Sequence, residues 1–186
     1  EDAGLADNTY IFFTTDNGSL GNTVSQINGQ QIRGGKGKMT NAGTHVPLIV
    51  VGPGISSGQV NDDLVDFTDF LPTFCEISGF TINEESTFNG HSLLAQLHGD
   101  DNHRREFIYC WYQIPGFMKK NFPGIVDMSF VRNQRYKLYR DGSFYDVDND
   151  QMETHSLRPN ECDQELIRMR DRMVALIKKH DGFRAE

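Results

Sequence analysis

Three polar side chains, Asp16, Asn17 and Lys36, are the best candidates for chemistry in this sequence. Asp16 and Asn17 directly follow an apolar stretch, residues 10–15. Their carboxylate and amide oxygens are the hard ligands that Ca²⁺ and Mg²⁺ prefer. Gly18 follows and permits the turn that would let both side chains reach one ion. Taken alone, the pair is more often an Asx turn without a ligand, and a glycosylation sequon also begins at Asn17.

Lys36 lies among glycines, in the segment Arg33-Gly34-Gly35-Lys36-Gly37. A lysine held by a glycine-rich backbone is a point charge suited to an oxygen of sulfate or phosphate. The segment is close to a nucleotide-binding P-loop, but five residues instead of four separate Gly29 from Gly35, and Gly37 replaces the required Ser or Thr. We therefore reject a nucleotide site. A solvated loop lysine remains the simpler alternative to an anion site.

The other titratable residues lack the spacing of a metal site. His45 begins the second apolar stretch, and a lone histidine is usually structural or exposed. The alternating Asp146, Asp148 and Asp150 imitate part of an EF-hand loop without its glycine or its closing glutamate. The three cysteines have no C-x-x-C spacing, and their odd number prevents complete pairing within the chain.

Composition limits the classes of partner. The chain has 186 residues and a formal charge of −8, from 18 basic and 26 acidic residues. An acidic surface argues against a nucleic acid or an anionic membrane as partner. No apolar run approaches the roughly 18 residues needed to span a bilayer. A small anionic substrate remains compatible, because a few local cations override the net charge within a Debye length of roughly 8–10 Å.

The first half of the chain has the pattern of an α/β protein. The apolar stretches 10–15 and 46–51 predict strands buried on both faces, typical of a parallel sheet, whose ligands gather at the carboxyl ends of the strands. Residues 19–45 predict a long functional loop, in which glycines let the backbone approach a ligand closely. Residues 66–79 predict a helix capped by Thr68 or Asp69.

The pattern changes after the polar run 98–105. Short strand-like pieces separated by turn signals then favour an antiparallel sheet, at residues 107–112, 128–132, 136–139 and 143–147. Residues 161–180 predict an amphipathic terminal helix. We therefore expect a domain boundary between residues 105 and 106.

Six segments occur in an order that is specific when they are taken together: Asp7–Gly18, Arg33–Pro47, Val65–Gly79, Asn89–Leu94, Arg135–Leu138 and Phe144–Thr154. Each resembles a segment of the sulfatase family of the alkaline phosphatase superfamily. The first is similar to the family's strand that ends in an Asp-Asn or Asp-His metal pair. The second is similar to its G-K-G … R/H-V-P segment, and Lys36 and His45 are nine positions apart, as in the family.

The resemblance implies a fold and a reaction. The fold would be α/β: the C-terminal part of a sulfatase-type mixed β-sheet flanked by helices (residues 1–105), then a small antiparallel sheet with a C-terminal helix (residues 106–186). The substrate would be a small-molecule or glycan sulfate ester. Asp16 and Asn17 would be two of the protein ligands to Ca²⁺, with Mg²⁺ as the alternative ion. Lys36 would be catalytic and bind a sulfate oxygen, and His45 would contact substrate.

The sequence departs from the family in one decisive respect. Sulfatases attack sulfur with a formylglycine made from Cys or Ser in a C/S-x-P/A-x-R motif, and no Cys or Ser of this chain lies in one. We expect the chain to be a fragment, inactive alone, with the formylglycine in the missing N-terminal part. Lys38–Ala42 also replaces the more usual T-T-x-E-G. The resemblance favours a periplasmic, secreted or lysosomal protein.

Two alternatives to a sulfatase remain open at this point. One is a phosphomonoester or phosphodiester hydrolase of the same superfamily. The other is a non-catalytic, truncated module that binds a metal or a carbohydrate.

Overall fold

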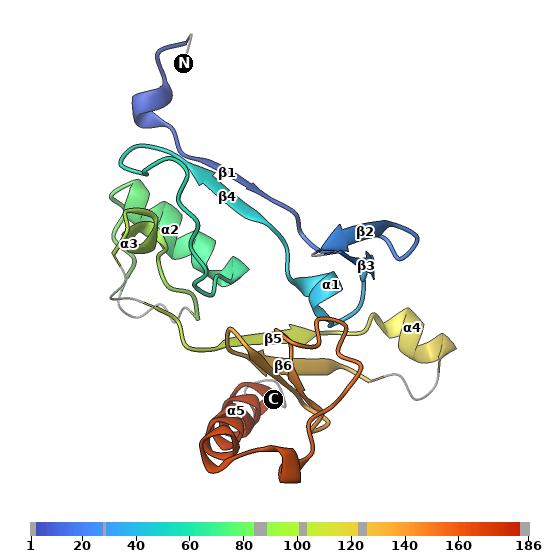
Figure 1. Cartoon of the computed structure of the whole chain (residues 1–186). Helices are drawn as coiled ribbons and strands as arrows, with labels where there is room; N and C mark the ends of the chain where they lie inside the picture. The colour runs from blue at the N-terminus through green and yellow to red at the C-terminus, as the bar shows by residue number, and fades with distance from the viewer. Residues whose placement is uncertain (1–2, 28, 84–88, 101–103, 123–125, 183–186) are drawn as a thin grey trace. The chain divides into compact units, whose positions relative to one another are not determined.

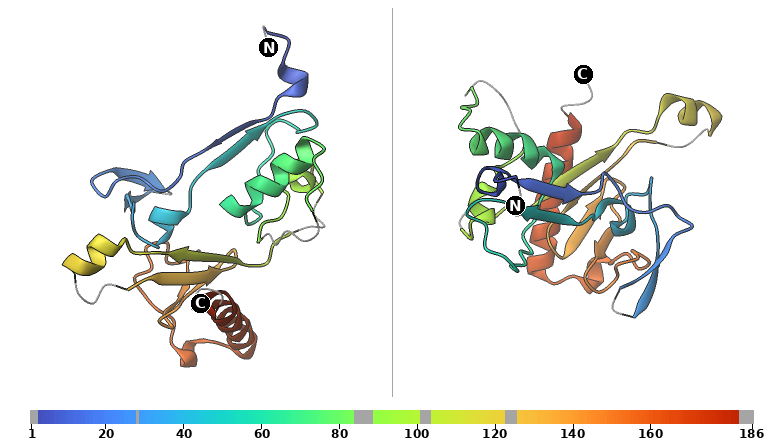
Figure 2. Two further views of the ribbon diagram at one scale, coloured as in Figure 1. Left: turned by 180° about the vertical axis from the view of Figure 1, so that it is seen from behind. Right: turned by 90° about the horizontal axis from the view of Figure 1, so that it is seen from above.

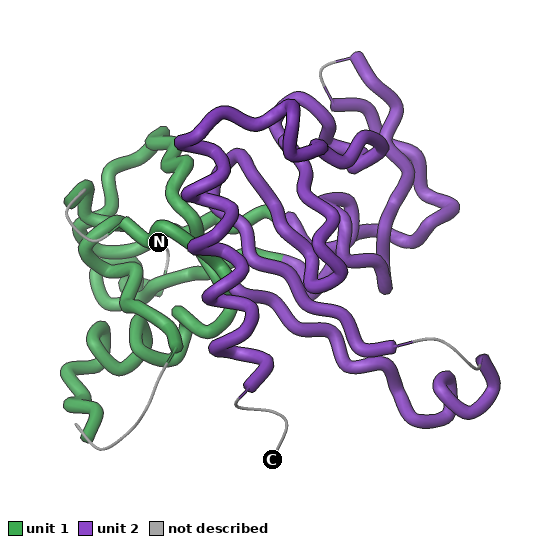
Figure 3. The backbone as a smooth tube through the Cα atoms, turned by 90° about the horizontal axis from the view of Figure 1, so that it is seen from below, with its two compact units in different colours: residues 1–14, 47–108 green, residues 15–46, 109–186 purple. Residues whose placement is uncertain are grey.

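The computed structural model of the chain describes residues 3–27, 29–83, 89–100, 104–122 and 126–182 (Figure 1). The chain divides into two compact units (Figure 3): Glu1–Thr14 with Pro47–Ile108, and Thr15–Val46 with Tyr109–Glu186. The segment with all four candidate site residues thus belongs with the C-terminal strands. The boundary expected between residues 105 and 106 stays a prediction for the whole protein, and residues 101–103 beside it lie outside the described residues.

The first unit is built on a two-stranded ribbon of β1 (Ile11–Thr14) and β4 (Leu48–Val51). The two strands are antiparallel, with Thr14 opposite Leu48, so the parallel arrangement expected for them is wrong. Burial on both faces is also wrong for the described residues. Successive side chains of a strand point to opposite faces, and the face that carries Phe12 packs while the other is more than half exposed.

The packed face of the ribbon meets helix α2 (Phe70–Ile77). Phe12 lies edge-on to Phe70 and Phe74, with ring centroids 5.9 and 5.2 Å apart. Edge-to-face aromatic pairs at such distances are favourable beyond the area that they bury. The helix predicted for this stretch is thereby confirmed.

The start of this helix differs from the expectation in one detail. A 3₁₀ turn, η2 (Phe67–Asp69), precedes α2, and Asp66 caps it by accepting a hydrogen bond from Thr68 N at 2.9 Å. The Asp69 carboxylate accepts from Asp66 N at 2.8 Å, which completes a reciprocal capping box. Asp66 therefore caps η2, while Asp69, one of the two predicted caps, is the N-cap residue of α2 but forms no side-chain cap hydrogen bond there.

Asp69 also holds two distant segments of the first unit. Its buried carboxylate accepts a hydrogen bond from His91 N at 2.8 Å and forms an ion pair with Arg105. Burial raises the pKa of Asp69 above its ordinary value, although the backbone N–H donors and Arg105 pull in the opposite direction. Two further short helices of this unit are η1 (Ala6–Asn8) and α3 (Leu94–Leu97).

The second unit contains a four-stranded antiparallel sheet in the order β5-β6-β7-β8, which confirms the expected C-terminal sheet. Its strands are β5 (Ile108–Tyr112), β6 (Met128–Arg132), β7 (Tyr136–Tyr139) and β8 (Phe144–Asp146). The terminal helix, α5 (Gln164–Gly182), packs against β6 and β7 (Figure 2). Two shorter helices are α4 (Gly116–Asn121) and η3 (Pro159–Glu161).

The core of this sheet comes from consecutive residues of β6 and β7, which are buried on both faces, and from α5. Apolar side chains with at most 7% of their surface exposed include Phe130, Val131, Leu138, Phe144, Met173 and Ile177. Across the part of the chain that the structure describes, no helix is long and apolar enough to cross a membrane.

The segment 15–46 is more ordered than the loop expected there. It contains a hairpin of β2 (Val24–Ile27) and β3 (Gln30–Arg33), paired antiparallel, and the short helix α1 (Asn41–Thr44). We call Thr15–Val46 the site segment.

Candidate functional site

Backbone hydrogen bonds draw the distant parts of the site segment together. The N–H of Gly18 donates to Gly43 O at 3.0 Å, and the N–H of Lys36 donates to Ser19 O at 3.0 Å. The turn that carries Asp16 and Asn17 is therefore joined both to the Lys36 turn and to α1, which leads into His45. The hairpin closes the intervening chain, because Gly34 N donates to Thr23 O at 2.9 Å.

Glycines make this close packing of backbones feasible. A Cβ atom on Gly18 would lie 1.9 Å from Ala42 O, and one on Gly34 would lie 2.1 Å from Leu20 O. A Cβ on Gly43 would likewise lie 2.1 Å from Lys38 O. These positions admit only glycine without a backbone shift. The glycines thus serve the approach of backbone to backbone within the segment, where the sequence suggested approach to a ligand.

The candidate side chains are accessible. Asp16 and Lys36 are exposed, and Asn17 is half-buried. Among the residues that the structure describes, none forms a side-chain hydrogen bond or ion pair with Asp16, Asn17 or Lys36. Their charged and polar groups are therefore free to meet a small ligand.

The pair Asp16–Asn17 is a partial ligand set for a hard cation. Carboxylate and amide oxygens suit Ca²⁺ or Mg²⁺, and Ca²⁺ takes roughly six to eight oxygens. Over the described residues, no group of three or more His, Cys, Asp or Glu side chains could hold a metal ion. The residues present fit such an ion in kind but do not complete its shell.

His45 follows α1 directly, and its N–H donates to Asn41 O at 2.9 Å. Its side chain keeps an exposed face. The pKa of His45 is lowered below 6.5, first because burial of part of the ring disfavours the charged form and then because Arg132 and Lys137 repel a third positive charge. The imidazole is therefore neutral at neutral pH.

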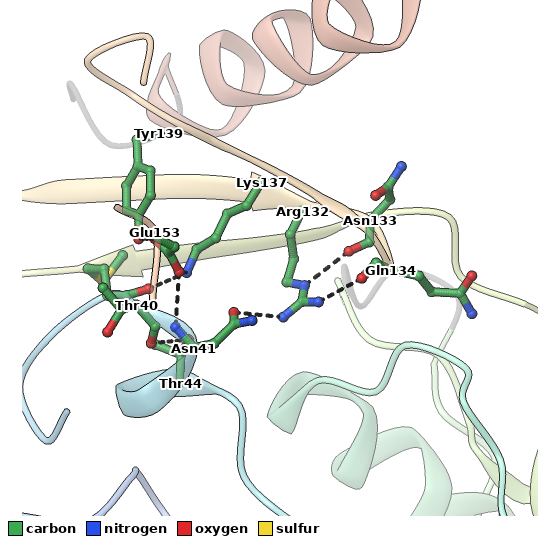
Figure 4. A network of polar contacts seen from close by, with 10 residues as sticks. Thr40, Asn41, Thr44, Arg132, Asn133, Gln134, Lys137, Tyr139 and Glu153 are labelled. Carbon is green, nitrogen blue, oxygen red and sulfur yellow. Dashed lines mark hydrogen bonds and ion pairs between the residues drawn. The ribbon is translucent and has the colours of Figure 1, made fainter. Parts of the chain in front are cut away.

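A buried polar network lies beside the site segment, and the sequence analysis did not anticipate it (Figure 4). Lys137 on β7 is fully buried, and its Nζ lies 2.9 Å from Glu153 Oε1. Lys137 Nζ also donates to Met39 O, and the Tyr139 hydroxyl donates to Glu153 Oε2. The N–H of Asn41 donates to Glu153 Oε1 at 3.0 Å. One carboxylate thus joins the sheet to the start of α1.

Arg132 extends the network from β6. Its Nη1 donates to Asn41 Oδ1 at 3.1 Å, while its Nε and Nη2 donate to the carbonyls of Asn133 and Gln134, each at 3.0 Å. The guanidinium is held on two sides, so it presents a fixed donor to the Asn41 side chain. Figure 4 shows Arg132 and Lys137 extending from neighbouring strands toward the start of α1.

Burial shifts the ionisation of the network. The pKa of Lys137 falls to about 8, because desolvation disfavours the ammonium more than the Glu153 carboxylate favours it. The pKa of Tyr139 is raised by burial and by its hydrogen bond to Glu153. The Lys137 ammonium also lies 4.2 Å from the centre of the Phe130 ring, a favourable cation–π distance.

Two of the three alternating aspartates considered in the sequence, Asp146 and Asp150, have partners within the chain. Asp146 pairs with Arg135 at 2.7 Å, and Asp150 accepts hydrogen bonds from Thr154 and His155. These two aspartates therefore serve the turn after β8. All three cysteines are free thiols.

The known proteins that this chain resembles in sequence are sulfatases. A family model described as N-sulphoglucosamine sulphohydrolase, C-terminal, matches residues 35–179. A sulfatase of Formosa agariphila is 31% identical over 96% of this chain and 34% of its own length. The human N-acetylglucosamine-6-sulfatase is 37% identical over 55% of this chain and 17% of its own length. The chain thus spans about a third or less of the length of these curated relatives.

Solved structures share the fold. A protein in complex with its substrate D-glucosamine-2-N,6-O-disulfate superposes with a TM-score of 0.71 and 21% identity, over 96% of this chain and 35% of its own. A phosphonate monoester hydrolase from Silicibacter pomeroyi superposes with a TM-score of 0.60 and 21% identity, over 78% of this chain and 31% of its own. At these identities the likeness establishes the fold alone.

Proposed function

Because the chain belongs to the sulfatase family, we propose that it is part of an enzyme that hydrolyses sulfate esters with a bound Ca²⁺ ion and a formylglycine nucleophile from outside this chain. The observation that carries the proposal is the site segment. Its hydrogen-bonded backbone joins the Asp16–Asn17 turn, the Lys36 turn and the approach to His45.

Lys36 supplies positive charge where the transferring sulfuryl group needs it. A fixed cation beside an oxygen of the group stabilises charge that develops there during transfer, and this preorganised electrostatic effect is often the largest single contribution to catalysis. The glycine backbone fixes the base of the side chain, and the exposed ammonium meets the anion. Lys36 is therefore the catalytic and sulfate-binding residue of the proposal.

Asp16 and Asn17 hold part of the metal shell. When bound, the cation supplies Lewis-acid stabilisation of a sulfate oxygen. The two side chains contribute oxygens from adjacent positions, and Gly18 provides the turn that follows them. Mg²⁺ remains the alternative ion for the same donors.

His45 contributes a neutral group. Since its pKa is below 6.5, the imidazole at neutral pH carries one N–H donor and no charge. The neutral imidazole can therefore donate a hydrogen bond to the sulfate ester, while Lys36 supplies the positive charge. We assign His45 to substrate binding.

The substrate class of the proposal is a small-molecule or glycan sulfate ester. Relatives named N-acetylglucosamine-6-sulfatase and ulvan-active sulfatase, and the neighbour solved with D-glucosamine-2-N,6-O-disulfate, support the glycan side of this class. The net charge of −8 does not oppose it, because the anion meets a local cation.

The test uses the full-length protein that contains this chain. We expect it to hydrolyse an aryl sulfate, to lose activity in a chelator, and to recover it with Ca²⁺. Asp16→Ala should remove this dependence together with most of the activity. Activity that survives both the chelator and Asp16→Ala would contradict the metal assignment.

The phosphoester alternative is measured in the same assay. The fold shared with a phosphonate monoester hydrolase makes it the natural competitor. Hydrolysis of an aryl phosphate without hydrolysis of an aryl sulfate would replace the first proposal by the second. Absence of both activities in the folded, metal-loaded protein would favour a binding module.

A further inference from the structure

We propose that the buried Lys137–Glu153 pair is a positioning device, which holds the part of the site segment between Lys36 and His45 in the geometry that anion binding requires. The inference rests on the proposed function, in which Lys36 binds the sulfate group. Neither Lys137 nor Glu153 touches the substrate in this account. Both act through the backbone of residues 39–41.

The contacts of the pair converge on this short stretch. Lys137 Nζ donates to Met39 O, and Glu153 Oε1 accepts from Asn41 N at 3.0 Å. Arg132 adds a hydrogen bond of 3.1 Å to the Asn41 side chain. The stretch begins three residues after Lys36 and ends four residues before His45. Figure 4 shows the contacts on Asn41, and restraints at the centre of this stretch limit the motion of the backbone that leads to Lys36 on one side and to His45 on the other.

Backbone hydrogen bonds carry the restraint from this stretch to Lys36. Gly35 N donates to Ala42 O at 3.2 Å, and Lys38 N donates to Gly35 O at 2.7 Å. The turn around Lys36 is thus bonded to α1, whose first residue is Asn41. A shift of α1 would move the Lys36 turn with it.

The backbone of Glu153 is a second, independent observation. Its φ is +54°, and Glu153 is the one non-glycine residue with positive φ among those that the structure describes. A residue with a side chain adopts this left-handed conformation at a cost in free energy, and such positions persist where the surroundings require them. Here the conformation accompanies a carboxylate bonded to Lys137, Tyr139 and Asn41 at once.

The residue before strand β7 offers an internal contrast. Arg135, two residues before Lys137 on the approach to β7, pairs with Asp146 at 2.7 Å, but its side chain is half exposed. Its ion pair joins β7 to β8 and involves no residue of the site segment. Arg135→Met is therefore the matched control for Lys137→Met.

Amide hydrogen exchange of the full-length protein tests the positioning directly. Lys137→Met removes the ammonium and keeps a side chain of similar length. We expect exchange in peptides covering residues 34–44 to rise about tenfold, since it reports the free energy of local opening. Arg135→Met should leave those peptides unchanged. Unchanged exchange over residues 34–44 in Lys137→Met would overturn the inference.

A second variant covers the case in which Lys137→Met does not fold. Glu153→Gln keeps the shape of the side chain and one acceptor oxygen but removes the negative charge. It should raise exchange over the same residues, and wild-type exchange there would equally overturn the inference.

Binding of inorganic sulfate links the positioning to the site. In the full-length protein, Lys137→Met should weaken sulfate affinity about tenfold, because small displacements of a binding group are costly. In a Lys36→Ala background the same change should have little effect. Equal losses in both backgrounds would mean a purely structural role and would overturn the inference.

The two proposals fail in different ways. Lys36→Ala alone should weaken the binding of inorganic sulfate but leave it measurable at high sulfate concentration; wild-type affinity in that variant would remove Lys36 from the proposed function. The exchange experiment does not depend on that result, because it follows the backbone of residues 34–44 and needs no ligand.

Discussion

The site segment and the β5–β8 sheet belong to one compact unit, yet they are stabilised in opposite ways. In the sheet, apolar side chains such as Val131 and Leu138 are almost completely buried. In the site segment, the side chains of Asp16 and Lys36 are exposed, and glycine backbones pack against one another. The difference shows how a polar segment can be held in place without a core of its own, provided that a core lies next to it.

The Lys137–Glu153 pair is the point at which the two regions meet. Its charges lie in the sheet, and its hydrogen bonds end on Met39 and Asn41 of the site segment. A buried ion pair is weak support for stability in general, because desolvation offsets its attraction. Its value here is the geometry that it imposes on a polar, glycine-rich neighbour.

Breaking this link has the largest expected effect on stability. Lys137→Met leaves the Glu153 carboxylate buried without its counter-ion, and we expect a loss of about 3–5 kcal/mol in the free energy of unfolding. Arg135→Met, at the exposed pair, should cost about 0–1 kcal/mol. Urea unfolding of the full-length protein measures both. Equal losses in the free energy of unfolding would mean that the buried pair and the exposed pair contribute equally to stability, and would contradict the distinction drawn between them.

Lys36→Ala separates function from stability. The side chain is exposed, so we expect the free energy of unfolding to change by less than about 0.5 kcal/mol. The rate on a sulfate ester should fall by about 10²–10³-fold, the range found when one preorganised electrostatic group is removed. Steady-state kinetics and thermal unfolding of one preparation give both numbers. A large loss of stability would place Lys36 in the framework of the segment.

Gly34→Ala tests the packing of backbones. Its new Cβ would meet Leu20 O at 2.1 Å, so the hairpin must shift, at an expected cost of about 1–3 kcal/mol. Gly21→Ala is the matched control, because its Cβ would lie 3.7 Å from Gly34 O, an ordinary contact. The control should be neutral or slightly stabilising. Thermal unfolding distinguishes the two, and an unaffected Gly34→Ala would refute the steric role of this glycine.

The smallest expected effect is the pH dependence of stability that arises from His45. Its pKa is lowered in the folded state, so the unfolded chain binds more protons as the pH falls through 6.5. Its contribution to stability is therefore complete above pH 6.5 and declines as the pH falls below that value. The difference in melting temperature between wild type and His45→Gln, measured from pH 5 to 8, should show this slope. A slope of the opposite sign would mean that the imidazolium is stabilised.

Much of the molecule was predictable from local pattern. Turn signals between short strand-like pieces gave the bounds of β6 and β7, and the apolar stripe of α5 gave the terminal helix. The candidate site residues were selected by type and order, because Asp16, Asn17, Lys36 and His45 stand in the succession of the family's segments, and their roles stay predictions. Local pattern suffices for such features, since turn residues and helix periodicity are visible in neighbouring residues of the sequence.

Tertiary structure decided three other features. The antiparallel pairing of β1 with β4 depends on the path of the chain between them, and an apolar strand reads the same in either direction. The glycines could not be assigned to backbone packing before their partners were known, as Gly34 against Leu20 illustrates. The burial of Lys137 was hidden because lysine is a surface residue by default, and its counter-ion Glu153 lies 16 positions away. By itself, the sequence pointed to the groups that we propose bind a sulfate ester. Only the fold decided what holds them, because that role belongs to contacts between residues far apart in the chain.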